Sequence, residues 1–408
     1  CPPRPEAIAY GIYKFLHTIR RNSKRVVKKP IVPNLGEHLI KTGLLPLTHR
    51  IPSRWTIYVK GNRIVDAYKW FGYNHRGMEK AFEMRTWLQN QYLVSRVEGF
   101  FASSHQHAYV LVGEKCANIY DDVSTRAKYI RCITSELERI HEHMLSYGML
   151  THELGEINFF HTILRDREIV MDVIEKISGN RVTSDIIMLG GVNRDIPLTL
   201  AQQVIVLMKK LRKRVEHYLE TANRRSHRVR LEGVGYLSYE EALHHSAVGP
   251  NLRASGVNHD LRRDVSYDAY DEIPSEVFQV ITRNEGDILA LSHVYLEETL
   301  VSIDIVIWLL ENIPEGELRQ PWRRHVSPNE AFQCIEAPNG ENFHYGRSNG
   351  SQKPERYKIR TPIRANLSST IFRLIGQQIA DAPIILSILD PCIGCTEKRM
   401  FIDIKKHR

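Results

Sequence analysis

The chain has 408 residues, 42% of them hydrophobic, and a formal net charge of +9. This length and composition suffice for one large domain or two ordinary ones, each with a sizeable core. No run of about 18 apolar residues is free of charge, and the nearest, Thr299 to Leu310, contains Asp304, so we expect no membrane span.

Residues 1–45 are predicted to form a basic, proline-interrupted extension, in which charge concentrates from Arg20 to Lys29. A second basic run extends from Lys209 to Tyr218. We interpret both runs as solvated faces or as contacts with an acidic subunit or anionic lipid. No nucleic acid partner is expected, because no recognition motif accompanies the charge. The N-terminal stretch lacks the apolar centre and cleavage site of a signal peptide, so we expect an intracellular protein.

Apolar and polar residues alternate from Arg54 to Tyr73 around Gly61-Asn62, which predicts a β-hairpin. Beyond it the apolar period changes to three or four residues, which predicts long helices. Ser124 is the expected N-cap of the first of these helices. Its predicted apolar face consists of Ile130, Ile133, Leu137, Ile140 and Met144.

A second helix is predicted from Leu200 to Tyr218, and a third from Asp287 to Pro314. The third is apolar nearly all round, so we place it at the centre of the fold. The glycine-rich stretch from Asn339 to Pro354 is predicted to be a loop or hairpin tip.

The expected fold class is α+β and mainly helical. Residues 46–120 are expected to form a small N-terminal α+β part that follows the extension. Residues 121–330 form the helical bundle core. Residues 331–408 are expected to be a short, irregular C-terminal segment.

Cys392 and Cys395 form a C-x-x-C pair, whereas the other cysteines are scattered. Scattered thiols fit a reducing compartment rather than a disulfide framework. The pair brings two sulfurs within reach of one metal ion or of each other. By spacing alone it fits a redox or persulfide pair, a partial metal site, or two inert buried thiols.

One carboxylate, two imidazoles and a phenol occur together between Glu98 and Tyr109. His105 and Tyr109 are four residues apart, so they share a face if this stretch is helical. Glu98, His105 and Tyr109 are therefore candidates for proton delivery to a reducible group. The alternative is a satisfied polar network at the start of a helix.

Glycines stand beside arginines and carboxylates from Gly249 to Asp264. The spacing is not that of a standard phosphate-binding loop. We expect a structured loop held by arginine–carboxylate pairs.

Seven stretches, taken in order, are similar to those of one superfamily. They are Tyr73 to Trp87, Ser95 to Lys115, Cys132 to Met149, Gly190 to Pro197, Gly249 to Ile273, Glu336 to Gly350 and Tyr357 to Leu367. From about residue 45 to about residue 400, the chain resembles the large subunits of nickel-iron hydrogenases and the homologous quinone-site subunit of respiratory complex I. The resemblance implies their helical-bundle fold.

The chain departs from the hydrogenase pattern at the metal site. Hydrogenases of this family have R-x-C-G-x-C where this chain has Arg96 to Phe101, so Glu98 and Phe101 stand at the cysteine positions. They have an arginine where this chain has Asn339. Two thiolates cannot replace four, and a lost cation no longer offsets anionic ligands. We therefore expect no metal bound by this chain and no hydrogen chemistry.

The resemblance implies further substrate contacts. Arg96 is expected to hold an anionic substrate or the Glu98 carboxylate, or to form an ordinary structural ion pair. Asn339 is expected to contact substrate at the position of the lost arginine. Tyr109 matches the tyrosine that quinone-site subunits use against the quinone headgroup, and His49 lies near their loop histidine.

A chain that keeps the C-terminal cysteines and lacks the N-terminal pair is most similar to a third branch, the large subunits of archaeal membrane-bound sulfane sulfur reductases. This similarity implies reduction of polysulfide or organic polysulfanes near Cys392 and Cys395, since a thiolate attacks a sulfur–sulfur bond directly. Electrons would come from ferredoxin through 4Fe-4S clusters in partner subunits, namely a small iron-sulfur subunit and a ferredoxin-type cluster subunit. Membrane arm subunits would move ions, and this chain would be peripheral, at the cytoplasmic face of the cell membrane.

Three other functions fit the same residues. Quinone-type reduction is favoured by Tyr109 with His49, whereas sulfur reduction is favoured by the retained cysteine pair. A hydrogenase-related redox subunit of another kind is the second alternative. A purely structural subunit with a relic cavity is the third.

Overall fold

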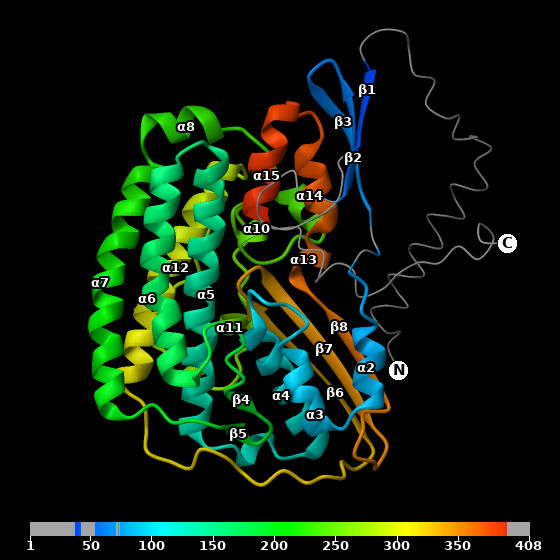
Figure 1. The fold of residues 1–408 in the computed structure, drawn as a ribbon, viewed down its shortest axis with the longest axis vertical. Coiled ribbons are helices and arrows are strands. Elements are labelled where there is room, and N and C mark those ends of the chain that lie inside the picture. Colours follow the sequence, from blue (N-terminus) through cyan, green and yellow to red (C-terminus); the bar gives the residue numbers. More distant parts are fainter. Residues whose placement is uncertain (1–36, 42–53, 71, 73, 390–408) are drawn as a thin grey trace, which may run out of the picture.

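The computed structural model describes residues 37–41, 54–70, 72 and 74–389. A bundle of long helices forms one side of the molecule, and two antiparallel sheets lie on the other (Figure 1). This arrangement confirms the mainly helical α+β class. In the described part of the chain, no helix is long and apolar enough to cross a membrane.

The bundle contains α5 (Thr125–Glu153), α6 (Ile157–Ser178), α7 (Leu198–Ala222) and α12 (Ile288–Glu311). Helix α12 packs against both α5 and α7, which confirms its predicted central position (Figure 1). Its Asp304 lies on a half-exposed side, where its Oδ1 accepts a hydrogen bond from Arg212 Nε of α7 at 3.0 Å. The charge within this apolar helix is therefore paired rather than buried alone.

Helix α5 begins as the sequence predicts. The Ser124 hydroxyl accepts a hydrogen bond from the Ala127 backbone N–H at 3.2 Å. All residues of the predicted apolar face are buried: Ile130, Ile133, Leu137, Ile140 and Met144.

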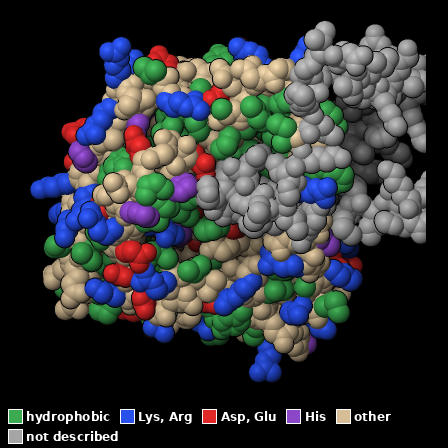
Figure 2. All heavy atoms as spheres, turned by 45° about the horizontal axis from the view of Figure 1, so that its top comes forward, with side chains coloured by type: hydrophobic (Ala, Val, Ile, Leu, Met, Phe, Trp, Pro, Cys, Tyr) green, Lys and Arg blue, Asp and Glu red, His purple; other side chains and the backbone are tan. Residues whose placement is uncertain are grey.

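The basic run on α7 is partly neutralised by its neighbours. Lys209, Lys210 and Lys213 are exposed, whereas Arg212 and Arg214 pair with carboxylates of α12 and α6. Figure 2 shows basic side chains interspersed with acidic and apolar ones over the face it presents. In the described residues, the run is mainly a solvated helix face.

The N-terminal sheet contains β1 (Glu37–Lys41), β2 (Trp55–Lys60) and β3 (Arg63–Lys69), in that order. Strands β2 and β3 form the predicted hairpin around Gly61-Asn62. Strand β1 lies within the stretch expected to be an extension, so the sheet begins earlier than the sequence indicates. Strand β1 has only five residues, and so short a stretch gives too little alternation of apolar and polar residues to identify a strand.

The second sheet contradicts the prediction of an irregular C-terminal segment. Its strands are β6 (Asn329–Ala337), β7 (Gly340–Ser348) and β8 (Arg356–Arg360). The stretch from Asn339 to Pro354 begins at a hairpin tip, as one of the two predictions for it states, but most of it is a strand. Helix α4 (Ala102–Ala117) packs against β6 and β7. The buried positions of β7 are occupied by small or polar residues, so no apolar alternation marks the strand. They are Gly340, Asn342, His344, Gly346 and Ser348.

The chain after β8 is also largely regular. Helices α13 (Pro362–Ala365), α14 (Leu367–Leu374) and α15 (Ala382–Leu389) follow, and α15 packs on α5. Shorter elements make the other connections: α2 (Met78–Met84), α3 (Trp87–Val94), β4 (Ile187–Met188), β5 (Gly191–Val192), α8 (Arg225–Leu231), α9 (Tyr239–His244), α10 (Pro250–Arg253) and α11 (Leu261–Asp264).

The loop before α10 crosses the β6–β7 turn, backbone against backbone. A Cβ on Gly249 would lie 2.4 Å from the Cα of Gly340, and a Cβ on Gly340 would lie 2.6 Å from the Gly249 nitrogen. Both residues have positive φ, 66° and 116°. Only glycine satisfies the conformation and the contact together.

We predict that Gly249→Ala lowers the free energy of unfolding by about 2–4 kcal/mol, because it adds backbone strain to a steric clash. Gly233→Ala is the matched control, since its φ is 74° but nothing lies within 4 Å of its added Cβ. Guanidinium unfolding should show a clearly smaller loss for the control. Equal losses would mean that the crossing contributes nothing.

Candidate functional site

The loop before α4 carries the residues that stand at the former cysteine positions. The Glu98 carboxylate is buried and accepts hydrogen bonds from the backbone N–H groups of Gly99 at 3.0 Å and Phe100 at 3.4 Å. Phe101 is fully buried and packs with Ala337 and Ile363. A phenyl ring offers no ligand atom, so this position cannot serve a metal ion.

Helix α4 begins directly after Phe101, and a carboxylate from α5 caps it. Glu138 accepts hydrogen bonds from the backbone N–H groups of Ser103 at 2.5 Å and Ser104 at 2.8 Å, and from the Ser104 hydroxyl. Burial raises the pKa of Glu138 to about 7, although these donors favour the ionised form. Glu138 is therefore a buried acid that titrates near neutrality, and no sequence motif marks it as a site residue.

His105 lies on the first turns of α4 and connects the loop to the second sheet. Its ring stacks on Phe101, with 5.4 Å between centroids. Its Nδ1 is 3.0 Å from His344 Nε2, and His344 Nδ1 is 2.9 Å from the Tyr357 hydroxyl. His344 and Tyr357 lie on β7 and β8, and no local sequence pattern marks them as site residues.

Tyr109 lies one turn further along α4, on the same face as His105, as the helical spacing predicts. Its hydroxyl donates to the Trp87 carbonyl at 2.7 Å, and its ring packs among Phe82, Trp87 and Tyr357. Burial raises the pKa of Tyr109 well above its ordinary value. These contacts give Tyr109 a packing function, and substrate contact by its hydroxyl stays a prediction.

Arg96 follows α3 and forms an ion pair. Its Nη1 lies 2.6 Å from Asp185 Oδ2, and Ser95 Oγ donates to the same carboxylate at 2.7 Å. The Arg96 side chain is about half exposed. Of the expectations for Arg96, the described contacts match a structural ion pair, and its partner is Asp185 rather than Glu98.

Asn339 occupies the tip of the β6–β7 hairpin and is buried. Its Oδ1 accepts from the Tyr295 hydroxyl at 3.1 Å, and its backbone carbonyl accepts from Asn366 Nδ2 at 3.2 Å. Among the described residues, none accepts a hydrogen bond from Asn339 Nδ2. A buried amide donor without a partner is costly, so this atom is suited to contact a ligand or a water molecule.

Three predicted site residues, His49, Cys392 and Cys395, lie outside the described residues. The last described turn before the cysteines belongs to α15. The Tyr295 hydroxyl is 3.4 Å from the Ile388 carbonyl as well as 3.1 Å from Asn339 Oδ1. The end of α15, which leads into the cysteine segment, is therefore close to Asn339.

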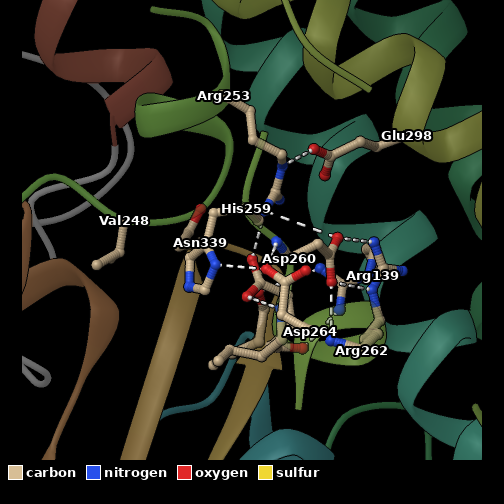
Figure 3. A network of polar contacts seen from close by, with 12 residues as sticks. Arg139, Val248, Arg253, His259, Asp260, Arg262, Asp264, Glu298 and Asn339 are labelled. Carbon is tan, nitrogen blue, oxygen red and sulfur yellow. Dashed lines mark hydrogen bonds and ion pairs between the residues drawn. The ribbon is translucent and has the colours of Figure 1, made fainter. Parts of the chain in front are cut away.

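A buried network of charges lies beneath the Asn339 turn (Figure 3). Arg253 Nε pairs with Glu298 of α12 at 2.6 Å, and its Nη1 pairs with Glu336 of β6 at 2.8 Å. Arg262 pairs with Asp260 at 2.6 Å and with Glu136 of α5 at 2.9 Å. These pairs confirm that the loop from Gly249 to Asp264 is held by arginine–carboxylate contacts.

A third arginine of the network donates hydrogen bonds to backbone carbonyl groups. Arg139 of α5 donates to the carbonyls of Glu336 at 2.5 Å and Ala337 at 3.1 Å. Burial alone would raise the pKa of Glu298, but Arg253 and His143 outweigh it and lower this pKa to about 2. The Arg253–Glu298 pair is therefore ionised at neutral pH, and the network positions the turn that carries Asn339.

The pKa of Glu138 leads to a prediction about pH. Because its folded-state pKa of about 7 lies above the ordinary 4.5, protonated Glu138 stabilises the fold below about pH 4.5, and this contribution is lost as the pH rises through 7. We therefore expect Glu138→Gln to gain about 2–3 kcal/mol in free energy of unfolding, relative to the parent chain, between about pH 4.5 and pH 8.

Urea unfolding at a series of pH values measures this difference. The exposed Glu240→Gln on α9 is the control for the loss of one surface carboxylate. A difference between Glu138→Gln and the parent that does not change with pH would contradict the prediction. It would show that the donors of α4 keep the carboxylate ionised.

The described part of the chain contains no group of three or more His, Cys, Asp or Glu side chains that could hold a metal ion. The site does offer the imidazole of His105, the amide N–H of Asn339 and the carboxyl of Glu138, whose pKa burial raises to about 7. Such a set suits the reduction of a group that becomes anionic.

Comparison with known proteins identifies the family of the chain. The family model of the respiratory-chain NADH dehydrogenase 49 Kd subunit matches residues 153–330 and 319–398. An NADH-quinone oxidoreductase subunit of Chloroherpeton thalassium is 33% identical over 86% of this chain and 85% of that protein. Membrane-bound hydrogenase subunit alpha of Pyrococcus furiosus is 32% identical over 85% of this chain and 84% of that protein.

Among solved structures, a chain of the membrane-bound sulfane sulfur reductase, an archaeal respiratory membrane complex, matches with a TM-score of 0.83 and 29% identity. The match covers 89% of this chain and 99% of that chain. The chain therefore belongs to the 49 kDa subunit family of the respiratory-chain NADH dehydrogenase, within the superfamily that also contains hydrogenase large subunits.

Proposed function

We propose that this chain is the catalytic large subunit of a ferredoxin-dependent, ion-pumping membrane complex that reduces sulfane sulfur. The observation that carries the proposal is the retention of Cys392 and Cys395 in a chain with Glu98 and Phe101 at the other cysteine positions. The match to a sulfane sulfur reductase chain over nearly its whole length supports it.

The chemistry follows from the thiols. One thiolate attacks a sulfur–sulfur bond of the polysulfane, forms a mixed disulfide and releases a thiolate or persulfide. The second thiolate attacks the mixed disulfide, forms the Cys392–Cys395 disulfide and releases the other sulfur fragment as an anion. A pair of electrons from the partner's cluster, supplied by ferredoxin, restores both thiolates. Each released anion takes up one proton when its pKa exceeds the pH, and Glu138 is suited to supply it.

The proposal includes partners, because no described group of this chain could bind a cluster or metal ion. Electrons would enter through 4Fe-4S clusters of a small iron-sulfur subunit and a ferredoxin-type cluster subunit. Membrane arm subunits would couple the reduction to ion transport. This chain would lie at the cytoplasmic face of the cell membrane as a peripheral subunit.

Quinone reduction is the second candidate, and it is favoured by the 33% identity to an NADH-quinone oxidoreductase subunit. Its predicted headgroup ligands are Tyr109 and His49. The Tyr109 hydroxyl already donates to the Trp87 carbonyl in a packed aromatic cluster. Quinone binding there requires that this hydrogen bond break, which weakens the candidate relative to sulfur reduction.

We predict that the purified complex contains no stoichiometric nickel. Glu98, Phe101 and Asn339 replace two thiolates and an arginine, so neither the ligands nor the charge balance of a nickel-iron centre remain. Elemental analysis and infrared spectroscopy measure this. Bands from iron-bound cyanide would overturn the prediction.

We predict that Cys392→Ser and Cys395→Ser each lower sulfur reduction by on the order of a hundredfold in the intact complex, because each removes a nucleophile. Cys334→Ser is the matched control, since burial raises the pKa of that half-buried thiol to about 12 and leaves it inert. Activity is compared with reduced ferredoxin and polysulfide, quinone or protons as acceptor.

Full sulfur activity in both serine variants would contradict a covalent function of the pair. Electrons would then pass directly from the partner's cluster to the substrate. Preferential turnover of quinone would instead favour the second candidate.

A further inference from the structure

A buried chain of hydrogen bonds runs from α4 into the second sheet. His105 Nδ1 lies 3.0 Å from His344 Nε2, and His344 Nδ1 lies 2.9 Å from the Tyr357 hydroxyl. All three side chains are fully buried. Each imidazole can carry its proton on either nitrogen. Which group donates in each hydrogen bond therefore depends on the groups at the two ends of the series.

At one end, Asn342 determines which His105 nitrogen accepts. Asn342 Nδ2 lies 3.5 Å from the Ser104 carbonyl and 3.3 Å from His105 Nδ1. A carbonyl oxygen only accepts, so the amide must present its NH₂ group there. The same NH₂ group faces His105 Nδ1, which must therefore be the unprotonated nitrogen.

At the other end, Tyr357 requires the same direction. Among the described residues, the hydrogen bond of its hydroxyl goes to His344 Nδ1. If His344 Nδ1 were protonated, the buried hydroxyl hydrogen would have no acceptor, which is unfavourable. Tyr357 therefore donates to His344 Nδ1, and His344 Nε2–H donates to His105 Nδ1.

We propose that Tyr357 and His344 are positioning residues that hold His105 as its neutral Nε2–H tautomer, and that His105 donates this N–H to the anionic sulfur of the reduced substrate. The donation of this N–H to sulfur rests on the proposed function, whereas the tautomer of His105 is a property of this protein alone. Because Nδ1 is committed to His344, Nε2–H is the atom that His105 can present to a substrate.

The direction of these hydrogen bonds also argues against His105 as the proton source. If a neutral imidazole gave up its Nε2 proton, protons would shift along the chain and leave a tyrosinate at Tyr357. Burial raises the pKa of Tyr357 well above its ordinary value, so that end state is strongly unfavourable. His105 therefore stabilises the developing charge as a fixed dipole, and the proton comes from another group.

The tautomer is measured directly by nitrogen NMR on the full chain, labelled with nitrogen-15 in its histidines. We expect His105 to show a protonated Nε2 and an unprotonated Nδ1. Asn342→Leu alone should keep this tautomer, because Tyr357 still sets the direction of the hydrogen bonds. Asn342→Leu combined with Tyr357→Phe removes both groups that set the direction and keeps the packed ring, so His105 should become a mixture of tautomers. A protonated Nδ1 at His105 in the parent chain would overturn the inference, as would an unchanged tautomer in the double variant.

Kinetics of the complete complex test the donor function. The side-chain amide nitrogen of glutamine replaces the Nε2–H of histidine but carries no transferable proton, so His105→Gln should keep sulfur reduction within about tenfold of the parent. His105→Leu, which has no donor, should lose on the order of a hundredfold in kcat. Tyr357→Phe should lose roughly fivefold in kcat with little change in KM.

Equal losses in His105→Gln and His105→Leu would indicate a general acid and overturn the donor function. The two proposals can fail separately. If the complex reduces no sulfane sulfur but the nitrogen spectrum shows the expected tautomer, the proposed function falls and the tautomer assignment stands. If sulfur is reduced but the tautomer is wrong, the opposite holds.

Discussion

The buried ion pairs between the loop from Gly249 to Asp264 and its neighbours are the constraint on which the site depends. Burying an arginine and a carboxylate costs several kcal/mol per ion, and only close pairing offsets that cost. Arg253 and Arg262 are each shared between two carboxylates, at 2.6–2.9 Å. Removal of one partner leaves a buried charge with fewer contacts, which destabilises the network.

The network determines where the Asn339 turn lies. Arg139 binds the carbonyls of Glu336 and Ala337, and Arg253 binds the Glu336 carboxylate. The turn is thereby connected to α5 and, through Glu298, to α12. Ala337 packs on Phe101 from one side, and Tyr295 joins Asn339 to the end of α15 from the other. Segments remote in sequence therefore converge because charges hold the backbone between them.

The sequence predicts α5, α7 and α12 because long runs of apolar residues mark them, whereas α6 is not among the predicted helices. The strand β7 has the opposite character, since Asn342 and His344 face inward and bond to groups of α4 and β8. A strand whose interior is polar carries no apolar alternation, so its pattern predicts a loop or hairpin tip. The inward-facing polar residues that hide the strand in the sequence are the ones that join α4 to the second sheet.

The same limit applies to single residues. His105 can be identified because it lies in a dense polar stretch, but its partner His344 is 239 positions away. Arg96 can be recognised as a cation, whereas Asp185, 89 positions away, cannot be recognised as its partner. Glu138 resembles any other glutamate on a helix until burial at the start of α4 raises its pKa. Residue types capable of chemistry can be identified from short stretches of sequence, but which of them form pairs depends on the fold.

The replacements of two cysteines and an arginine change the electrostatics of this part of the chain. This chain places the phenyl ring of Phe101, the amide of Asn339 and the imidazole of His105 here. Glu98 retains a carboxylate, which accepts hydrogen bonds from its own loop. On the proposed function, dipoles rather than full charges stabilise the anionic sulfur. Dipoles bind an anion less tightly than a cation does, so the reduced product leaves readily while the charge that forms during reduction is still stabilised.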